Sequence, residues 1–508
     1  MIGKVSTDQI PASAPLLRGL AQNPAAPTDV LLRLIHQWPE QACEGLRGRA
    51  HLPMPVQDVM ARHPSRRVRI ALAEHPGVAA RTRSGLLDDP QWQVWTRAFG
   101  RPGQQPLSDA ALVRLLTLLD EPPTGVPFTR EELLWELAFA MRHERRLFLL
   151  ASGHPQPGVR RFAAGALHFL DDPTRETLLG DPVPEVRAAA AQAQAEQRRL
   201  MQPADLPSTH CHAFWSVLQR PLSRALVDQV LASGDVEAVC FVATNASTPP
   251  DVVETLLGHP AADVRRKLAT RPDLTGAQAL RLAADPTAEV RTAVSVHPHL
   301  TEQQRAGIDI DLATVAGAGH YGPRDGCSLS VQHAPDESVP PLADALRWAR
   351  SVNPLLRRRA ARHPQLPTPL VAALAEDSDL GTRVLLAQHH PKAPPALLAR
   401  CFLEYDGCGR DRLTSLPNFP VAGLARFATH PDPAVRHLVA LDPHADPQLV
   451  DHLSADPDTA VRQAMAGCRR LPRKRIIALL DDPDLAFYAA ANPALPVRQM
   501  HRILRDAS

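Results

Sequence analysis

A proline followed four residues later by a branched or aromatic apolar residue recurs along this chain, and nine of these pairs keep a nearly fixed interval. Successive prolines of the pattern lie 26 or 27 residues apart in four stretches of chain: Pro64 and Pro90, Pro155 and Pro182, Pro260 and Pro286, and Pro431, Pro457 and Pro483. A period of this size indicates one supersecondary unit that is copied and stacked into a solenoid. The period constrains the architecture strongly, but it does not name a function.

The copy that begins at His259 shows how the first half of one unit is built. Pro260 is expected at the first helical position of a short segment. Val264 and Leu268 lie four residues apart, so they face the same side of that helix. A second proline, Pro272, stands eight residues after the valine and is expected to end the segment.

The second half of the unit begins with a helix-capping pattern. Thr275 and Gln278 have the spacing of a capping box, and Thr301 with Gln304 repeats it in the next copy. No segment alternates with period two, so strands are not expected. Since 26 residues cannot hold two long helices with their connections, we predict an all-α solenoid whose unit is a short α-helix plus a helical or 3₁₀ turn.

These residues resemble a known repeat family. The order Asp-Pro-x-x-x-Val-Arg, then Asn/His-Pro-x-Leu-Pro, then Leu-Leu-x-x-Leu resembles the leucine-rich repeat variant (LRV), a distant relative of HEAT-like repeats. Clear copies occur, with gaps, from Asn23 to Leu504. The resemblance implies a right-handed superhelix that alternates α and 3₁₀ helices. It says little about function, since solenoids carry very different tasks.

Interruptions of the period predict how the chain is divided. We expect an N-terminal tail (1–14), an N-terminal solenoid block (15–200), degenerate and then regular repeats (201–303), an irregular loop insertion (304–345) and a C-terminal block (346–508). Charge and glutamine gather at 192–199, and a smaller interruption follows at 405–420. The insertion is rich in glycine between Gly317 and Asp336, and such a long irregular loop is a candidate binding element.

Composition excludes several classes of protein. The net charge of +2, from 56 basic and 54 acidic residues, provides no global attraction to nucleic acid or to an anionic membrane. The seven cysteines are scattered and odd in number, which argues against a disulfide framework. Neither a signal peptide nor a membrane-spanning run is visible. We therefore expect a soluble cytoplasmic protein without a membrane partner, whose oligomeric state the sequence leaves open.

Arginine follows the repeated valine in most copies. The arginines at this position are Arg69, Arg160, Arg187, Arg265, Arg291, Arg436 and Arg462. Acidic residues stand close to each of them, either just ahead or at the Asp-Pro start of a unit, so a ladder of arginine–carboxylate bridges between copies is expected. Phe487-Tyr488 and Val94-Trp95 lack the arginine, which indicates a structural and tolerant position. The histidines that precede prolines are expected to form turns and caps.

Two basic clusters exceed what such a ladder requires. They are candidate macromolecule-binding sites and comprise Arg357, Arg358, Arg359 and Arg362 in the first cluster, and Arg469, Arg470, Arg473, Lys474 and Arg475 in the second. Either cluster could contact phosphates or an acidic protein, although a solvated helix face is the simpler interpretation. Neither cluster contains the interleaved aromatic residues that are usual in nucleic-acid readers.

An alternative function rests on one acidic and aromatic segment. Bacterial alkylpurine DNA glycosylases resemble this class of HEAT-like solenoid, and they work from a basic groove with Trp and Asp residues. Asp89 with Trp92 and Trp95 is the nearest match here, and these residues are the alternative DNA-site candidates. The simpler interpretation is that the tryptophans fill the space between copies.

No cofactor or metal is expected. The groupings His210-Cys211-His212, Cys401 with Cys408, and His320 with Cys327 and His333 lack the paired spacing of zinc sites. The iron–sulfur domain that some LRV proteins carry is not implied, since the first 200 residues hold only Cys43. The prediction is a non-enzymatic scaffold without catalytic residues that binds another macromolecule, a protein first and DNA as the alternative.

Overall fold

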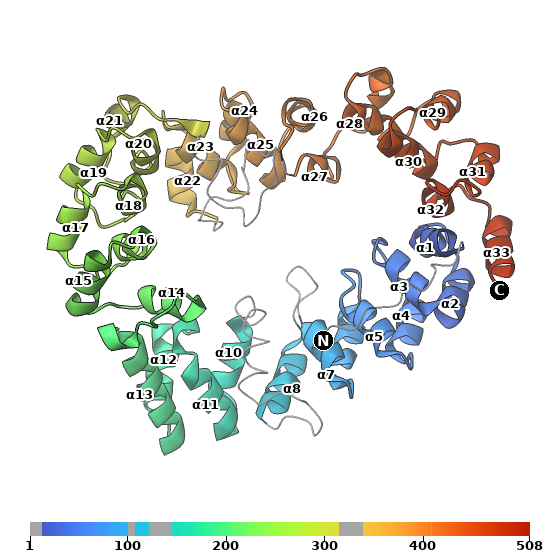
Figure 1. Ribbon diagram of the computed structural model, residues 1–508. Helices are drawn as coiled ribbons and strands as arrows, with labels where there is room; N and C mark the ends of the chain where they lie inside the picture. The colour runs from blue at the N-terminus through green and yellow to red at the C-terminus, as the bar shows by residue number, and fades with distance from the viewer. Residues whose placement is uncertain (1–12, 100–106, 121–144, 314–338, 408) are drawn as a thin grey trace. The chain divides into compact units, whose positions relative to one another are not determined.

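The computed structural model of this 508-residue chain describes residues 13–99, 107–120, 145–313, 339–407 and 409–508 (Figure 1). These residues form short α-helices and a few 3₁₀ helices, and they contain no β-strand; one isolated bridge joins Met201 and Leu222. The prediction of an all-α repeat array is confirmed. No helix within the described ranges is long and apolar enough to cross a membrane.

The chain divides into two compact units. Unit 1 comprises Met1–Ala195 and Val421–Ser508, and unit 2 comprises Glu196–Pro420. Both boundaries lie in or beside stretches where the sequence interrupts the repeat, and the charged segment before residue 199 belongs to helix α13.

The described helices of unit 1 are α1 (Ala14–Gln22), α2 (Thr28–Gln37), α3 (Pro39–Leu46), α4 (Met54–Ala61), α5 (Arg66–Ala73), α6 (Ala80–Gly85), η1 (Leu86–Asp88), α7 (Trp92–Phe99), α8 (Asp109–Asp120), α10 (Arg145–Ser152), α11 (Pro157–Gly165), η2 (Leu167–Phe169), α12 (Asp172–Leu179), α13 (Pro184–Arg198), η5 (Leu424–Phe427), α28 (Pro433–Arg436), η6 (His437–Leu441), α29 (Pro447–Leu453), α30 (Thr459–Gly467), α31 (Arg473–Leu479), α32 (Ala486–Ala491) and α33 (Val497–Asp506). Helix α13 continues three residues past the boundary of the unit.

The described helices of unit 2 are η3 (Pro203–Asp205), α14 (His212–Leu218), α15 (Arg224–Ser233), α16 (Val236–Thr244), α17 (Pro250–Leu256), α18 (Ala262–Leu268), α19 (Gly276–Ala283), α20 (Ala288–Val294), α21 (Glu302–Ala306), α22 (Leu342–Trp348), α23 (Pro354–Ala361), α24 (Thr368–Ala375), α25 (Leu380–His389), α26 (Pro395–Glu404) and α27 (Arg410–Thr414).

Helices α18 and α19 show the construction of one repeat. The expectation that Pro260 occupies the first helical position is wrong, because α18 begins two residues later with Ala261 as its N-cap. The capping box at the start of α19 is confirmed: the Gln278 amide donates to Thr275 Oγ1 at 3.2 Å, and the Thr275 amide donates to Gln278 Oε1 at 2.9 Å. Val264 and Leu268 are fully buried and face the core as expected.

In many repeats a histidine or aspartate before a proline closes a tight turn. A histidine Nδ1 accepts the backbone N–H two residues later, at 3.1 to 3.3 Å, in His63, His154, His259, His297, His363 and His430. Aspartates use a carboxylate oxygen in the same way, as Asp285 does for the Thr287 amide at 2.9 Å. A residue before proline is held away from the helical region, so its side chain is well placed to satisfy this amide. The expected turn-forming role of the histidines is confirmed.

The arginine ladder is also confirmed. An arginine of one repeat donates through Nε and Nη2 to both carboxylate oxygens of the aspartate that begins the next repeat. The closest distances in these pairs are 2.6 Å for Arg69–Asp89, 2.7 Å for Arg160–Asp181, 2.7 Å for Arg265–Asp285, 2.6 Å for Arg357–Asp377 and 2.8 Å for Arg436–Asp456. Arg291 pairs with Asp309 at 2.9 Å, whereas Arg187 and Arg462 donate to backbone carbonyls of Asp181 and Asp456.

A second ladder joins the repeats through the residue that stands before the second proline or at the equivalent position. Asn245 Nδ2 donates to the carbonyls of Leu218 and Arg220, at 2.9 and 2.8 Å, one repeat earlier. Asn492 makes the same pair of bonds to Ala466 and Cys468 at 2.7 and 2.8 Å. These bonds satisfy carbonyl groups at the ends of the first helices, which the helices themselves leave unpaired.

Within unit 1 the first repeat stacks on the last one. Asn23 Nδ2 donates to the carbonyls of Ala490 and Asn492 at 2.9 and 2.7 Å, which are the bonds that Asn492 makes to the repeat before it. Helix α1 lies beside α32 in Figure 1. The approach is close, since a Cβ at Gly19 would lie 2.2 Å from the carbonyl oxygen of Phe487. This junction was not predicted from the sequence.

Removing one ladder carboxylate should destabilise unit 2. The side chains of Arg265 and Asp285 are 11% and 5% exposed, so Asp285→Ala leaves an uncompensated guanidinium in a poorly solvated position. We expect a loss of about 3 kcal/mol of unfolding free energy, measured by urea denaturation. The matched control is Glu254→Ala, which breaks an ion pair with Arg281 that is 56% exposed on both sides and should cost less than about 1 kcal/mol. Equal losses in the two variants would contradict a structural role for the ladder.

The junction between α1 and α32 should be sensitive to a single methyl group. Gly19→Ala should cost about 2 kcal/mol and raise the amide exchange rate of both helices, because the new Cβ collides with backbone. Gly276→Ala, where nothing lies within 4 Å of the new atom, is the control and should leave stability unchanged or slightly higher. Normal exchange protection of α32 in Gly19→Ala would show that the two ends do not stack.

Stability should fall in mild acid through His297, a histidine that precedes a proline. Burial lowers the pKa of His297 below its ordinary value of 6.5. The unfolded chain therefore binds this proton more readily, and unfolding free energy is lost as the pH drops through and below about 6.5. His297→Asn should flatten this slope between about pH 7 and about pH 5, because asparagine makes the same bonds at Asn245 without titrating. Urea denaturation at a series of pH values tests this, and an unchanged slope would exclude His297 as a contributor.

Candidate functional site

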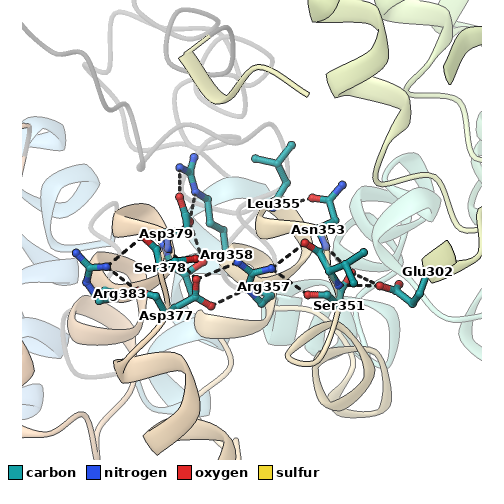
Figure 2. Close-up of polar contacts among 12 residues, drawn as sticks. Glu302, Ser351, Asn353, Leu355, Arg357, Arg358, Asp377, Ser378, Asp379 and Arg383 are labelled. Atoms are coloured by element: carbon teal, nitrogen blue, oxygen red, sulfur yellow. Dashed lines mark hydrogen bonds and ion pairs between the residues drawn. The ribbon is translucent and has the colours of Figure 1, made fainter. Parts of the chain in front are cut away.

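The first basic cluster lies on α23, and its arginines reach into the neighbouring repeat (Figure 2). Arg357 Nε and Nη2 donate to the two carboxylate oxygens of Asp377 at 2.6 and 3.0 Å. Its Nη1 donates to the carbonyls of Ser351 and Val352, both at 3.0 Å. The side chain is 16% exposed, so Arg357 is a member of the arginine ladder.

Arg358 makes a second bidentate pair beside the first one. Its Nε and Nη2 donate to Asp379 at 2.8 and 2.7 Å, and Figure 2 shows the two pairs side by side. A Cβ at Gly381 would lie 2.2 Å from Nε, so only glycine leaves room for this guanidinium. Burial alone would raise the pKa of Asp379, but the hydrogen bonds from Arg358 and Thr382 hold it below its ordinary value.

The arginines of the cluster around Arg357 therefore mainly hold neighbouring repeats together. The side chains of Arg357 and Arg358 are 16% and 11% exposed, and each is saturated by a carboxylate. Arg359 and Arg362 are half-buried and also take part in interactions. A macromolecule-binding role for this cluster remains a prediction, and two of its four residues have most of their donors occupied.

Contacts within unit 2 join the repeats on either side of the insertion. Glu302 accepts hydrogen bonds from Ser351 Oγ and the Val352 amide, both at 2.8 Å, and Figure 2 shows this contact beside the arginine pairs. Asn353 Nδ2 donates to Ser295 Oγ at 2.7 Å. The stack therefore continues across the insertion. The glycine-rich segment between Gly317 and Asp336, predicted as a candidate binding element, lies outside the described residues.

The second basic cluster, at α31, differs from the first. Arg470 donates to the Ala445 carbonyl at 3.0 Å, and Arg475 donates to Ser454 Oγ at 2.9 Å. Arg469, Arg473 and Lys474 are exposed, and the contacts of the described residues give them no ion-pair partner.

Helix α33, the second helix of the next repeat, adds to this cationic surface. Arg498 and Arg505 are exposed there, and neither forms an ion pair within the described ranges. We call the five residues Arg469, Arg473, Lys474, Arg498 and Arg505 the α31–α33 basic surface.

The candidate residues for a DNA glycosylase site are part of the framework. Asp89 pairs with Arg69 at 2.6 Å, and its side chain is 5% exposed. Trp95 is 2% exposed in the core of unit 1, and Trp92 packs against the same core while partly exposed. These residues do not provide the exposed carboxylate beside an aromatic ring that base excision requires.

The cysteine and histidine groupings gain no metal-site geometry in the described parts of the chain. No group of three or more His, Cys, Asp and Glu side chains there could hold a metal ion. His210 contacts Asp235 at 2.9 Å, and burial raises the pKa of the Cys401 thiol to about 12. Cys408, His320, Cys327 and His333 lie outside the described residues.

A hollow of about 560 Å³ lies where the first and last repeats of unit 1 meet. We call it the junction hollow, and its lining includes Gln22, Arg49, His51, Phe487, Tyr488 and Pro493. The rings of Phe487 and Tyr488 are perpendicular, with centroids 5.0 Å apart. A smaller hollow of about 500 Å³ in unit 2, beside Phe241 and Asn245, occupies the corresponding place at the end of a first helix.

Two departures from the repeat pattern mark the junction hollow in the sequence. Phe487-Tyr488 stands where most repeats have Val-Arg, so no ladder arginine fills this space. Arg49 stands where other repeats place Asn23, His75 or Asn245, before the second proline or its equivalent. Neither substitution identifies a site alone, because the two residues lie far apart in sequence and meet only through the stacking of α1 on α32.

Comparisons with known proteins leave the family open. No family model matches the chain, and no curated protein does. A solved structure described as an engineered protein is similar over 93% of this chain and 98% of its own, with 12% identity and a TM-score of 0.13. This similarity is too weak to support an argument about fold or function.

Proposed function

We propose that this chain is a non-enzymatic repeat scaffold, of the kind that LRV and HEAT-like arrays represent, and that it binds another protein on an extended surface. The observation that supports the proposal is the α31–α33 basic surface. Arg473, Lys474, Arg498 and Arg505 are exposed on the second helices of two successive repeats, and Arg469 is exposed in the turn before the first of these helices. The ladder arginines, in contrast, are paired with the aspartates of neighbouring repeats. Cations left unpaired by the framework are available to a partner.

The chemistry of this surface indicates an acidic protein partner. Four cationic groups on two helices, with Arg469 in the turn before α31, can meet carboxylates over an extended area, which gives orientation and fast association. A single-stranded nucleic acid would be expected to stack bases on aromatic residues between the cations. The residues of α31 include no aromatic side chain, so an acidic protein is the better match.

Charge reversal on α31 should weaken the interaction. Tagged protein carrying Arg473→Glu and Lys474→Glu would be compared with wild type in pull-downs from source lysate, with and without nuclease. We expect a partner protein that is still recovered after nuclease treatment. Its recovery should fall about tenfold with the double variant and should also fall as the salt concentration rises.

The control makes the same change in charge elsewhere. Lys267→Glu with Arg281→Glu reverses two exposed cations in unit 2 and should leave recovery unchanged. Equal loss with both double variants would contradict the assigned surface. Partners that disappear on nuclease treatment, together with bound nucleic acid, would contradict protein binding and favour the DNA-binding alternative.

A further inference from the structure

Arg49 is a cation without a carboxylate in the junction hollow. Its Nη1 donates to the carbonyl of Asn23, and its Nε reaches the carbonyl of His51 at 3.4 Å. The described contacts give Nη2 no acceptor. Burial lowers the pKa of Arg49, and no nearby acid opposes that effect. Carbonyl groups carry only partial charge, so they compensate the guanidinium less well than a carboxylate would.

Arg271 occupies the same position in another repeat and shows what is missing. Its Nη1 donates to the Asn245 carbonyl at 2.6 Å, over the same separation of 26 residues as the Arg49 bond to Asn23. In addition, Nε and Nη2 of Arg271 donate to both carboxylate oxygens of Asp273 at 2.9 and 2.6 Å. Asp273 stands two residues after the arginine, whereas His51 holds that place after Arg49.

The walls of the hollow suit an apolar group next to the anion. Phe487 and Tyr488 are partly exposed and line it together with Ala491, Pro493 and Pro24. Among the described residues that line it, Arg49 and the exposed His51 are the basic side chains. An aromatic or aliphatic body could therefore pack on the rings while its anionic group meets Arg49.

We propose that the junction hollow binds a carboxylate carried on an aromatic or aliphatic body, with Arg49 taking the acid in the bidentate manner that Arg271 takes Asp273. One guanidinium matches the single charge of a carboxylate, while a phosphate would call for more cationic groups than Arg49 and His51 supply. The carboxylate can belong to a free organic acid or to an acidic residue of a peptide. This site is separate from the α31–α33 basic surface and does not depend on the scaffold function.

The hollow exists only while the two ends of unit 1 are stacked. Residues 22–51 form one side of it, and residues 467–493 form the other. A ligand that bridges them binds the stacked state and not the separated one, so it stabilises the junction by mass action. Ligand binding should therefore slow amide exchange in α1 and α32.

The test uses full-length protein and four defined probes. Saturation-transfer NMR titrations would measure 3-phenylpropionate, its neutral analogue 3-phenylpropanamide, phenyl phosphate, and the capped tripeptide acetyl-Ala-Asp-Phe-amide. We expect the carboxylate to bind at least about tenfold more tightly than the amide, since a charge-assisted pair is lost. Tighter binding of the tripeptide than of 3-phenylpropionate would identify a peptide as the source of the acid, and the reverse would identify a small organic acid.

The second part of the test repeats the titrations with the variant Arg49→Asn. Asparagine holds the corresponding position at Asn23 and Asn492, where it keeps the inter-repeat hydrogen bonds, so the fold should survive. Binding of the carboxylate should weaken about tenfold or more, and Arg271→Asn should leave it unchanged. Equal binding of acid and amide to the wild type, preference for phenyl phosphate, or full binding by Arg49→Asn would each overturn the proposal.

Discussion

The turn formed by the residue before each proline is the interaction on which the stack depends. Proline fixes the backbone direction and removes one amide donor, and the preceding residue is held in an extended conformation. Its side chain then accepts the amide two residues later, as His259 and Asp285 do at the first prolines of their repeats. The same side chain can accept further hydrogen bonds: Asp285 also accepts one from Arg265 of the repeat before it. One short turn therefore sets both the entry of a helix and the contact between copies.

The polar residues at the two prolines of a repeat have different roles. Aspartate at the first proline receives an arginine, while asparagine, histidine or arginine at the second proline donates to carbonyls of the previous repeat. Most polar groups of both ladders are hydrogen-bonded, which is the condition under which such groups can be kept inside a protein. A ladder group whose donors are all occupied is not available to a partner, so candidates for function are residues outside the ladders and ladder residues with a donor left over, such as Arg49. This distinction separates the exposed Lys474 from Arg357, although both stand in equally basic stretches of sequence.

The sequence predicted those features that repeat and missed those that occur once. The period and the pairing of an arginine with the next Asp-Pro recur in several copies, and the Thr/Gln capping box occurs in two, so a single chain displays them repeatedly. Local composition could not distinguish Arg358 from Arg473, because the carboxylate that saturates Arg358 lies 21 residues away. The stacking of Asn23 on Ala490 joins residues 467 positions apart, and no periodic pattern encodes which two repeats meet. The junction hollow depends on that contact and was hidden for the same reason.

The contact between α1 and α32 also has a consequence for the order of folding. The end repeats of a solenoid normally need a polar outer face, because one side of each has no neighbour. Here the apolar faces at the two ends of unit 1 cover each other, with Gly19 against Phe487. During synthesis the first repeat emerges with that face uncovered and stays so until Ala490, which lies 467 residues after Asn23, has been made. Completion of unit 1 is thus a late, long-range step, and the newly made chain carries an exposed apolar surface over most of its translation.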